Sequence, residues 1–531
     1  MRSTFMGLET ARRGMFTQQS ALHTTGHNIS NANTPGYTRQ RINFEQTEPY
    51  PNASLNRPQI PGQVGTGVKA GSIQRVRESF LDVQYRGENN KLGYWETRAE
   101  AYNKLEEVLN EPSESGLSKT MDQFWQSLQD LAVNPTNPGA RSVVRQRGIA
   151  VAETFNYLHN SLSSIQRDLK NEITVAEKEI NSITYQISKI NGQIAAVEPH
   201  GYLPNDLYDE RDRLIDQLSS IANIKVDYTN SGGGSLKMAE GQAVIKMVSD
   251  SGKELGILVS GDRYNEVNVN FDGAGESVKT VSIGQSKFDF NDLKTTGKLK
   301  ALIDSYGYEK DGKVAGVYPE MMTKLDDLAY TFATEFNKVH ETGVSPNDIL
   351  KGEKAGNPFF ADAENETIER AGFAGRIALA QEIHNSLDNI ATAQGEVKTD
   401  ANGDKYVDAT VGDSSNALEL ANVFNKPLEY AEDFTPNNMA DDEMANFRNY
   451  YEGVIGGMAV LSQEAVRLTQ NSGSLREAVD NRRKSVSSVS LDEEMTNMIQ
   501  FQHAYNASAR MITLQDEMLD KIINGMGTVG R

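Results

Sequence analysis

The C-terminal stretch decides the fold of this chain; it reads LDEEMTNMIQFQHAYNASARMITLQDEMLDKIINGM over residues 491–526. An apolar residue recurs there at every seventh position, in the series Leu491, Met498, Tyr505, Ile512, Leu519 and Met526. A series with the same spacing begins the chain, at Leu8, Met15, Leu22 and Ile29. A repeat of seven places an apolar stripe along one side of a helix, and that stripe must be buried against a partner. We therefore expect the two ends to pack on each other or on further copies of the chain.

The last helix is also apolar outside this stripe. Leu514, Met518 and Ile522 lie off the series, and Phe501 and Met511 widen it. A helix with more than one apolar face suits neighbours on two sides. We predict an assembly interface that comprises Leu8, Met15, Leu22, Ile29, Leu491, Met498, Phe501, Tyr505, Ile512, Leu519 and Ile522.

Composition limits the classes of function. A length of 531 residues argues for several domains, and a formal net charge of −20 disfavours nucleic acid and anionic membranes as partners, since both attract a basic face. The chain has no cysteine, which excludes disulfides, thiolate catalysis and cysteine zinc sites. No stretch of about eighteen apolar residues predicts a membrane span. Residues 1–20 lack the apolar core and the cleavage site of a secretory signal, so any export is expected to use a route without a cleaved signal.

Apolar periodicity predicts helices over about 4–30, 78–110, 140–198, 207–221, 319–341 and 447–486. The first is expected to stop before Tyr37, because Pro35 cannot continue a helix and Gly36 allows a positive φ. Seams of alternating three- and four-residue spacing run over about 162–197 and 447–486. The two seams are alike in length and pattern, so we expect them to pack together. A capping box at Ser490-Leu-Asp-Glu493 then starts the last helix in a new phase.

The middle of the chain changes period. Short apolar runs between Gly, Asn and Asp predict an antiparallel β domain over about 224–292, and residues 343–440 look mixed. The predicted fold class is a multi-domain α+β protein, with a long α-helical coiled-coil rod formed by the N- and C-terminal segments and β-rich domains inserted in the middle. The chain is expected to run out along the rod, make a distal β excursion and return, so that both termini lie at one end.

Four domains are expected from this order of elements. They are a terminal helical assembly domain of residues 1–60 with 490–531, a helical rod domain of 61–223 with 297–342 and 441–489, an antiparallel β domain of 224–296, and a mixed insertion of 343–440.

Candidate sites for metals or catalysis are weak. His23 and His27 have the spacing of metal ligands on a helix, but the residues between them lack the acid of an H-E-x-x-H motif, so we favour a plain helix surface. The sequence predicts no catalytic residue, no metal site and no cofactor.

An acidic group at the predicted helix over about 207–221 needs a separate interpretation. Asp206, Asp209, Glu210 and Asp212 match neither an EF-hand loop nor a glycosidase-type carboxylate pair. We interpret them as a solvated helix face, with Arg211 and Arg213 as their partners.

Two terminal motifs carry a family resemblance. The first follows the N-terminal heptad helix and reads Asn28-Ile-Ser-Asn-Ala-Asn-Thr-Pro-Gly-Tyr37. The second lies in the last helix, at Leu491-Asp-Glu-Glu-Met495, Ile499-Gln-Phe-Gln502, Ala504-Tyr505, Ala507-Ser-Ala-Arg510 and Asp516-Glu-Met-Leu519. With both motifs the chain resembles the bacterial flagellar axial proteins, the family of rod, hook and hook-associated subunits.

Three internal stretches narrow the resemblance to the hook–filament junction members of that family. They are Phe124-Trp-Gln-Ser-Leu-Gln-Asp-Leu131 with Asn134-Pro135 after it, Asp209-Glu-Arg-Asp-Arg-Leu214, and Asn481-Arg-Arg-Lys-Ser-Val486. The resemblance covers about 1–225, 297–342 and 440–531 and is weak over 230–292 and 345–435.

The resemblance implies a secreted structural subunit and no enzyme. It places the chain at the extracellular hook–filament junction, where paired terminal helices form the inner part of a helical tube. It also implies export through the flagellar type III apparatus. The implied partners are further copies in a helical ring, hook protein on one side, a second hook-associated protein on the other, and an export chaperone at the C-terminal helices, with no nucleic acid and no membrane.

Two other functions stay open at this point. One is another axial protein of hook or rod type, against which the length and the three internal stretches argue. The other is a multi-domain hydrolase, which needs a catalytic constellation in the middle domains that we do not find in the sequence.

Overall fold

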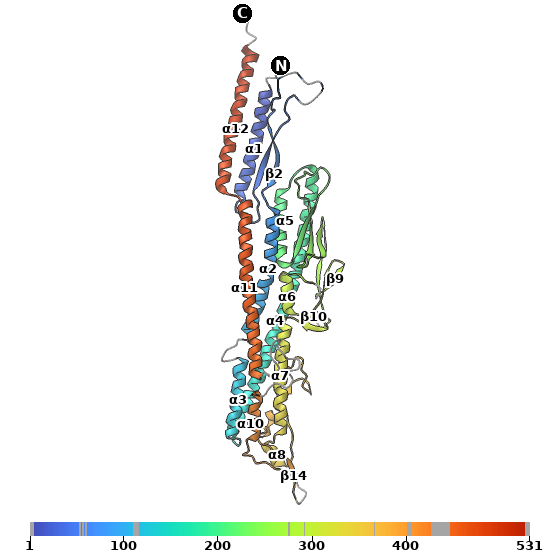
Figure 1. The fold of residues 1–531 in the computed structure, drawn as a ribbon, viewed down its shortest axis with the longest axis vertical. Helices are drawn as coiled ribbons and strands as arrows, with labels where there is room; N and C mark the ends of the chain where they lie inside the picture. The colour runs from blue at the N-terminus through green and yellow to red at the C-terminus, as the bar shows by residue number, and fades with distance from the viewer. Residues whose placement is uncertain are drawn as a thin grey trace.

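The computed structural model describes residues 5–51, 55, 58, 61–109, 116–273, 275, 277–290, 293–365, 367–400, 405–425 and 446–525. They form an elongated molecule of long helices with small sheets along one flank (Figure 1). The helices are α1 (Phe5–Ser30), α2 (Ser79–Leu109), α3 (Leu117–Val133), α4 (Pro138–Val197), α5 (Asn205–Ile221), α6 (Lys298–Tyr306), α7 (Val317–Thr342), α8 (Pro346–Lys351), α9 (Gln381–Asn385), α10 (Ser415–Asn422), α11 (Phe447–Ser487) and α12 (Leu491–Asp520). The strands are β1 (Gln40–Gln46), β2 (Val68–Arg75), β3 (Ile224–Thr229), β4 (Gln242–Val248), β5 (Glu254–Ser260), β6 (Arg263–Tyr264), β7 (Val267–Phe271), β8 (Val278–Ile283), β9 (Ser286–Asp289), β10 (Tyr308–Lys310), β11 (Lys313–Ala315), β12 (Phe360–Asp362), β13 (Ile377–Leu379), β14 (Val397–Thr399) and β15 (Lys405–Val407). This mixed architecture confirms the predicted fold class.

The first and last helices pack against each other at one end of the molecule (Figure 1). They run antiparallel, because a Cβ added at Gly7 would lie 3.1 Å from the Gln515 side chain and one at Gly14 would lie 3.1 Å from Ser508 Oγ. Both glycines lack a side chain where the helices are closest, so the backbones approach closely. The expectation that the two ends meet is confirmed.

Strands β1 and β2 complete this end as an antiparallel hairpin with a register shift between Asn43 and Phe44. The hairpin packs on α1, where the Thr17 hydroxyl donates a hydrogen bond to the Val68 carbonyl oxygen at 3.2 Å. We call α1, β1, β2 and α12 together the terminal module, and we call α2 to α7 with α11 the rod.

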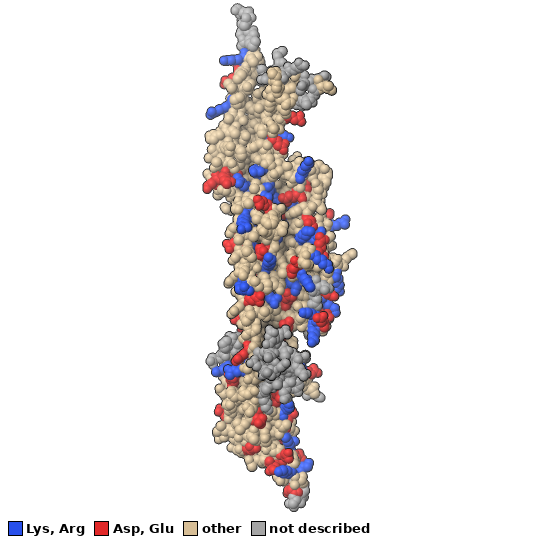
Figure 2. All heavy atoms as spheres, viewed as in Figure 1, with Lys and Arg blue, Asp and Glu red and all other residues tan. Residues whose placement is uncertain are grey.

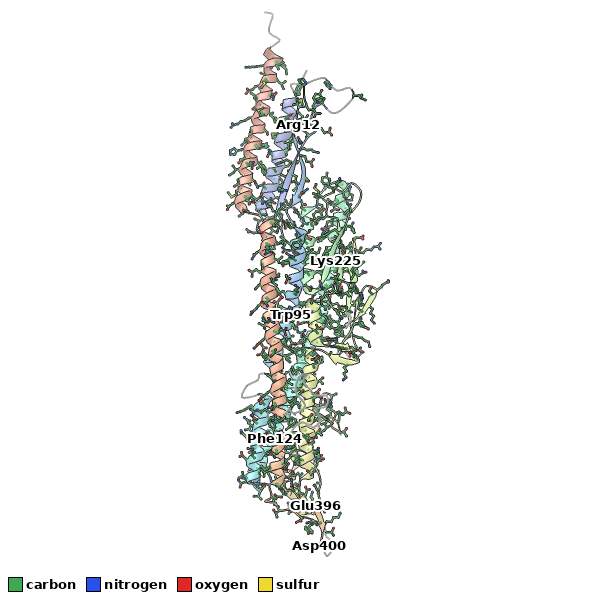
Figure 3. All side chains as sticks on the ribbon, viewed as in Figure 1. Arg12, Trp95, Phe124, Lys225, Glu396 and Asp400 are labelled. Atoms are coloured by element: carbon green, nitrogen blue, oxygen red, sulfur yellow. The ribbon has the colours of Figure 1, made fainter. Side chains whose placement is uncertain are left out.

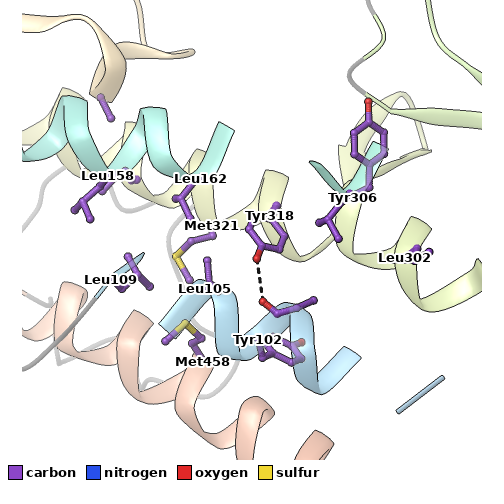
Figure 4. Packing of buried hydrophobic residues seen from close by; sticks show 14 of the residues in the cluster. Tyr102, Leu105, Leu109, Leu158, Leu162, Leu302, Tyr306, Tyr318, Met321 and Met458 are labelled. Atoms are coloured by element: carbon purple, nitrogen blue, oxygen red, sulfur yellow. Dashed lines mark hydrogen bonds between the residues drawn. The ribbon is translucent and has the colours of Figure 1, made fainter. Parts of the chain in front are cut away.

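The rod is built from long helices whose apolar faces meet in one core. α2, α4, α7 and α11 contribute Leu105, Leu162, Met321 and Met458, which lie close together in Figure 4. The Tyr318 hydroxyl donates a hydrogen bond to the Ala101 carbonyl oxygen at 2.9 Å, so even the polar atom of this core is satisfied.

The expected pairing of the two long seams is wrong. α11 packs along α2, whereas α4 packs on α3, α5, α6 and α7. Within the seam predicted over 447–486, the apolar residues Leu461 and Leu475 are exposed. Periodicity shows that a helix has a buried face, but it does not identify the helix that covers that face.

The β domain predicted over about 224–292 does not form a distal excursion either. A sheet of order β3-β4-β5-β6 and a second sheet of order β11-β10-β8-β7, with β9 on β8, lie along the middle of the rod (Figure 1). The reason is α4, which is 60 residues long and carries the chain back from the far end before the strands begin. The distal end is instead formed by α3, α8, α10 and β12 to β15.

Six phenylalanines hold the distal end together, around Phe124 of α3 (Figure 3). Neighbouring rings lie 5.0–6.2 Å apart between centroids, and all six side chains are 0–2% exposed: Phe124, Phe332, Phe336, Phe359, Phe360 and Phe447. We call this group the phenylalanine cluster.

Candidate assembly interface

The heptad residues of the terminal module lie in or beside the seam between α1 and α12. Half-buried there are Leu8, Met15, Leu22 and Ile29 of α1, and Met498, Phe501, Tyr505, Ile512 and Leu519 of α12. Phe501 also packs edge-on against Phe44 of β1, with 6.0 Å between the ring centroids. Leu491 and Ile522 stay exposed, and Met526 lies outside the described residues. Contact of these residues with a neighbouring copy stays a prediction.

Two rows of apolar side chains on α12 lie outside this seam, with 43–56% of each side chain exposed: Leu491, Met495 and Ile499 in the first row, and Met511, Leu514, Met518 and Ile522 in the second. Because successive helical residues turn by about 100°, the two rows lie on different sides of the helix. Met495 and Ile499 were not among the predicted residues. Their spacing of four from Leu491 is the signal that could have found them.

The visible face of the terminal module carries fewer charges than the middle of the molecule. In Figure 2 the lysine, arginine and acidic side chains gather along the middle of the molecule, whereas the end formed by the terminal module is mostly uncharged on the visible face. An apolar surface with few charges is the composition expected of a protein–protein interface.

The motif after α1 has a structural role in holding β1 against that helix. Asn28 is buried; its amide donates to the Gln40 carbonyl oxygen at 2.8 Å, and its side-chain oxygen accepts from the Gln40 N–H at 3.0 Å. The Tyr37 hydroxyl donates to the same Asn28 oxygen at 2.8 Å. His27 Nδ1 lies 2.9 Å from the Tyr37 hydroxyl.

The two histidines of α1 lie in different surroundings, since His27 is hydrogen-bonded to Tyr37 and His23 is exposed. Among the residues that the structure describes, no group of three or more histidine and carboxylate side chains is placed to hold a metal ion.

Arg39 connects the terminal module to the rod at one point. Its N–H donates to the Ser487 carbonyl oxygen at the end of α11, at 2.8 Å, and its own carbonyl oxygen accepts from the Val76 N–H at 2.8 Å. Its guanidinium donates to Glu493 at 2.6 Å and to Glu494 at 2.7 Å. These carboxylates lie in the first turn of α12, where the helix dipole also favours negative charge.

The acidic group of α5 is not a solvated face, and that interpretation is corrected here. Asp209, Asp212 and Arg211 are buried, whereas Asp206 is exposed and the Glu210–Arg213 pair, at 2.6 Å, lies at the helix surface as expected. The partners of Asp209 and Asp212 are arginines far away in sequence, which the helix pattern could not reveal.

We call the resulting ion-pair cluster the joint, because it lies where the terminal module meets the rod. It contains the five arginines Arg75, Arg77, Arg86, Arg211 and Arg483 and the five carboxylates Asp82, Asp209, Asp212, Asp216 and Glu240. Charges buried this deeply are stable only when they are paired and hydrogen-bonded.

The motif stretches Asp209–Leu214 and Asn481–Val486 meet in this joint. Arg483 contacts Asp216 at 2.5 Å and lies over the Tyr85 ring at 3.9 Å from its centroid. The N-terminal motif Asn28–Tyr37 also reaches the joint, since the N–H of the next residue, Thr38, donates to Asp209 at 3.0 Å. A groove of about 700 Å³ lies beside the joint, and residues 32–38 line one wall of it.

The first and last helices lie together in one module, which has an apolar surface and is connected to a helical rod through the buried joint. These features define a structural subunit of an assembly. None of the described helices is long and apolar enough to cross a membrane. The comparisons with known proteins identify the assembly. A family model described as the flagellar hook-associated protein FlgK helical domain matches residues 102–360. Models of the flagellar basal body rod proteins match residues 8–38 and 485–525.

Relatives match over the full length. The chain is 45% identical over 535 residues to flagellar hook-associated protein 1 of Bacillus subtilis, with 100% of both chains covered, and 24% identical to that of Escherichia coli, with 97% and 99% covered. A solved structure of the flagellar hook junction protein FlgK from Burkholderia pseudomallei has a similar fold, with a TM-score of 0.55 and 14% identity over 76% of this chain and 100% of that one.

The chain belongs to the flagellar hook-associated protein 1 family. It is a structural protein of the extracellular flagellum at the hook–filament junction and not an enzyme, as the sequence resemblance implied. The rod-protein models match only residues 8–38 and 485–525, at α1 and α12, whereas the match to hook-associated protein 1 runs over the full length. The alternative of a hook or rod subunit is therefore set aside.

Proposed function

We propose that the terminal module is the part of the chain that binds neighbouring copies, and that it builds a helical ring between hook and filament. The observation that carries the proposal is the pair of apolar rows on α12, which remain exposed after α1 has covered the seam. Full burial of one such side chain contributes roughly 1.5–3 kcal/mol. Several half-exposed side chains per copy are enough to drive association.

The two rows favour an open arrangement over a closed dimer. A single self-complementary patch produces a two-fold dimer, whereas two different patches produce head-to-tail contacts that continue into a ring or a helix. In this proposal the predicted interface residues act in two ways. The half-buried ones hold α12 on α1, and Leu491 and Ile522 contact neighbours together with the other members of their rows.

The flanking partners follow from the same arrangement. We propose hook protein on one side of the ring and a second hook-associated protein on the other. Before assembly an export chaperone covers the rows of α12, because an exposed apolar helix would otherwise aggregate. We propose that the chain has the four predicted domains, with β2 added to the terminal assembly domain because it pairs with β1.

Charged substitutions in the two rows test the interface. Ile499→Asp and Leu514→Asp each place a carboxylate in one row, at side chains that α1 does not bury. Each variant should keep the far-UV circular dichroism of the monomer and lose concentration-dependent assembly in sedimentation velocity. In cells that lack the native gene, each should leave hooks without filaments.

Gln463→Asp is the matched control, because it adds the same charge at an exposed position of the helix α11, which lies outside the terminal module. It should assemble normally. Normal assembly of both row variants would disprove the interface.

A further inference from the structure

One carboxylate in the joint is shared by three arginines. Asp212 Oδ2 lies 3.0 Å from Arg75 and 3.1 Å from Arg77, and Asp212 Oδ1 lies 3.2 Å from Arg86. Arg75 ends β2 of the terminal module, whereas Arg86 lies in α2 of the rod, and Arg77 lies between them. Asp212 itself lies in α5, so its carboxylate contacts both β2 of the terminal module and α2 of the rod from a third element.

Asp212 is ionised and well protected from water. Its side chain is buried, and burial alone would favour the neutral form. The guanidiniums of Arg77, Arg75, Arg86 and Arg211 outweigh that effect and hold the pKa of Asp212 well below its usual range. By contrast, burial raises the pKa of Asp209, which has Arg75 as its main cationic partner.

Both covalent links between the terminal module and the rod pass through this place. The first link, Val76–Glu78, directly follows Arg75 and contains Arg77, and both arginines contact Asp212. The second, Ser488–Ser490, lies between Arg483, which contacts Asp216, and Glu494, which contacts Arg39. The two links alone are short irregular segments, and the ion pairs restrict the angle that these segments can adopt.

We propose that Asp212 is the positioning residue that fixes the direction in which the terminal module leaves the rod. It does so without contacting a neighbouring copy, by holding β2 and α2 to one carboxylate. The proposal assigns a role to the Asp209–Leu214 motif, which the apolar interface does not use. Only the purpose of this fixed direction rests on the proposed function, since successive copies would need it in order to meet.

The direction can be measured in the monomer, because the native chain has no cysteine and engineered cysteines can be labelled singly. Spin labels at Gln463→Cys of α11 and Gln502→Cys of α12, both exposed, report the distance between rod and terminal module. The otherwise native chain should give one narrow distance distribution by electron double resonance. Asp212→Asn should lose that single peak and give a broad distribution.

Two controls separate a change of direction from general unfolding. A second label pair within the rod, Gln463→Cys with Lys178→Cys, should keep its narrow distribution in Asp212→Asn. Glu210→Gln removes a carboxylate of the same motif that contacts only the exposed Arg213, and it should leave both distributions narrow. An unchanged distribution between rod and terminal module in folded Asp212→Asn would overturn the proposal.

A variant at the edge of the joint decides the matter if Asp212→Asn does not fold. Glu240 is partly exposed and pairs with Arg75 and Arg211, so Glu240→Gln weakens the same cluster with less disturbance. Broadening in Glu240→Gln supports the proposal, and a narrow distribution there overturns it. Because all these measurements use the monomer, they are independent of whether Ile499→Asp and Leu514→Asp block assembly.

Discussion

The phenylalanine cluster and the seam of the terminal module are both apolar, yet they are covered to different degrees. Phe336 and its neighbours are enclosed by helices and strands on all sides. In the terminal module, α12 has α1 and the hairpin on one side only, and Leu514 and Met518 remain about half exposed. The comparison teaches that residues for assembly are as apolar as core residues but are covered on fewer sides in the monomer. Burial in the monomer therefore distinguishes an assembly residue from a core residue.

The largest expected difference is in stability. Phe336→Ala should lower the free energy of unfolding of the rod by about 3–5 kcal/mol, because it leaves a cavity in the cluster. Leu514→Ala, on the exposed row, should change monomer stability by no more than about 0.5 kcal/mol. Denaturant unfolding followed by circular dichroism measures both. Equal losses would mean that α12 is as fully packed as the distal end.

A buried arginine makes a second contrast with the joint. Arg141 is 1% exposed and has no carboxylate in contact among the described residues; its guanidinium donates to the carbonyl oxygens of Pro135 and Ile390, at 2.9 and 2.8 Å, and to the Thr392 hydroxyl at 2.9 Å. Arg141→Met should cost about 3 kcal/mol, because it leaves these acceptors buried and unpaired. Arg147→Met in the same helix, at an exposed position, is the control and should unfold like the native chain in thermal scans.

Acid should weaken the distal end before it reaches Asp212 of the joint, whose pKa the surrounding arginines hold well below its usual range. His340 is buried; its neutral ring donates from Nδ1 to the Asn357 carbonyl oxygen at 2.7 Å and accepts the Ala391 N–H at Nε2 at 3.0 Å. Burial lowers the pKa of His340 from its ordinary value of 6.5 to about 4. Protonation therefore favours the unfolded chain, and the stability present above pH 6.5 is lost as the pH falls toward 4.

Between pH 7.5 and pH 5 this loss should be about 2 kcal/mol, measured as the pH dependence of thermal unfolding. His340→Gln cannot gain a proton and should flatten the profile in that window. A native profile that is already flat there would refute the assignment.

The smallest expected effect is at the start of α12. Ser490 caps this helix by accepting the Glu493 N–H. Ser490→Ala should cost about 0.5 kcal/mol and appear as faster hydrogen exchange in the first turns of α12. Exchange in the phenylalanine cluster should not change. Slower assembly without faster exchange would show that the serine acts in contacts between copies instead.

The helices were the most predictable part of the fold. Their apolar periods and breaks, such as Pro35 after the first helix and Ser490 before the last, are local, and the structure begins and ends α1, α4 and α12 within a few residues of the expected positions. Local signals determine a helix before any tertiary contact is known.

The main errors concern partners distant in sequence. Helical spacing alone made Asp209 and Asp212 look like a solvated face, since Arg75, Arg77 and Arg86 lie more than a hundred residues earlier. For the same reason α4 was the expected partner of α11, whereas the structure packs α11 on α2. Of the candidate interface, the sequence identified the seam and most of the second row, and it missed Met495 and Ile499 of the first.

The meeting of α1 with α12 also sets an order of folding. These helices are separated by almost the whole chain, and closing so long a loop is the entropically most demanding contact that the molecule makes. While the chain is being synthesised, α1 can pack on the hairpin of β1 and β2, but its α12 side stays uncovered until the last helix is complete. We expect the terminal module to form last and to open first, so that a newly made chain has its assembly surface only once every other part is in place.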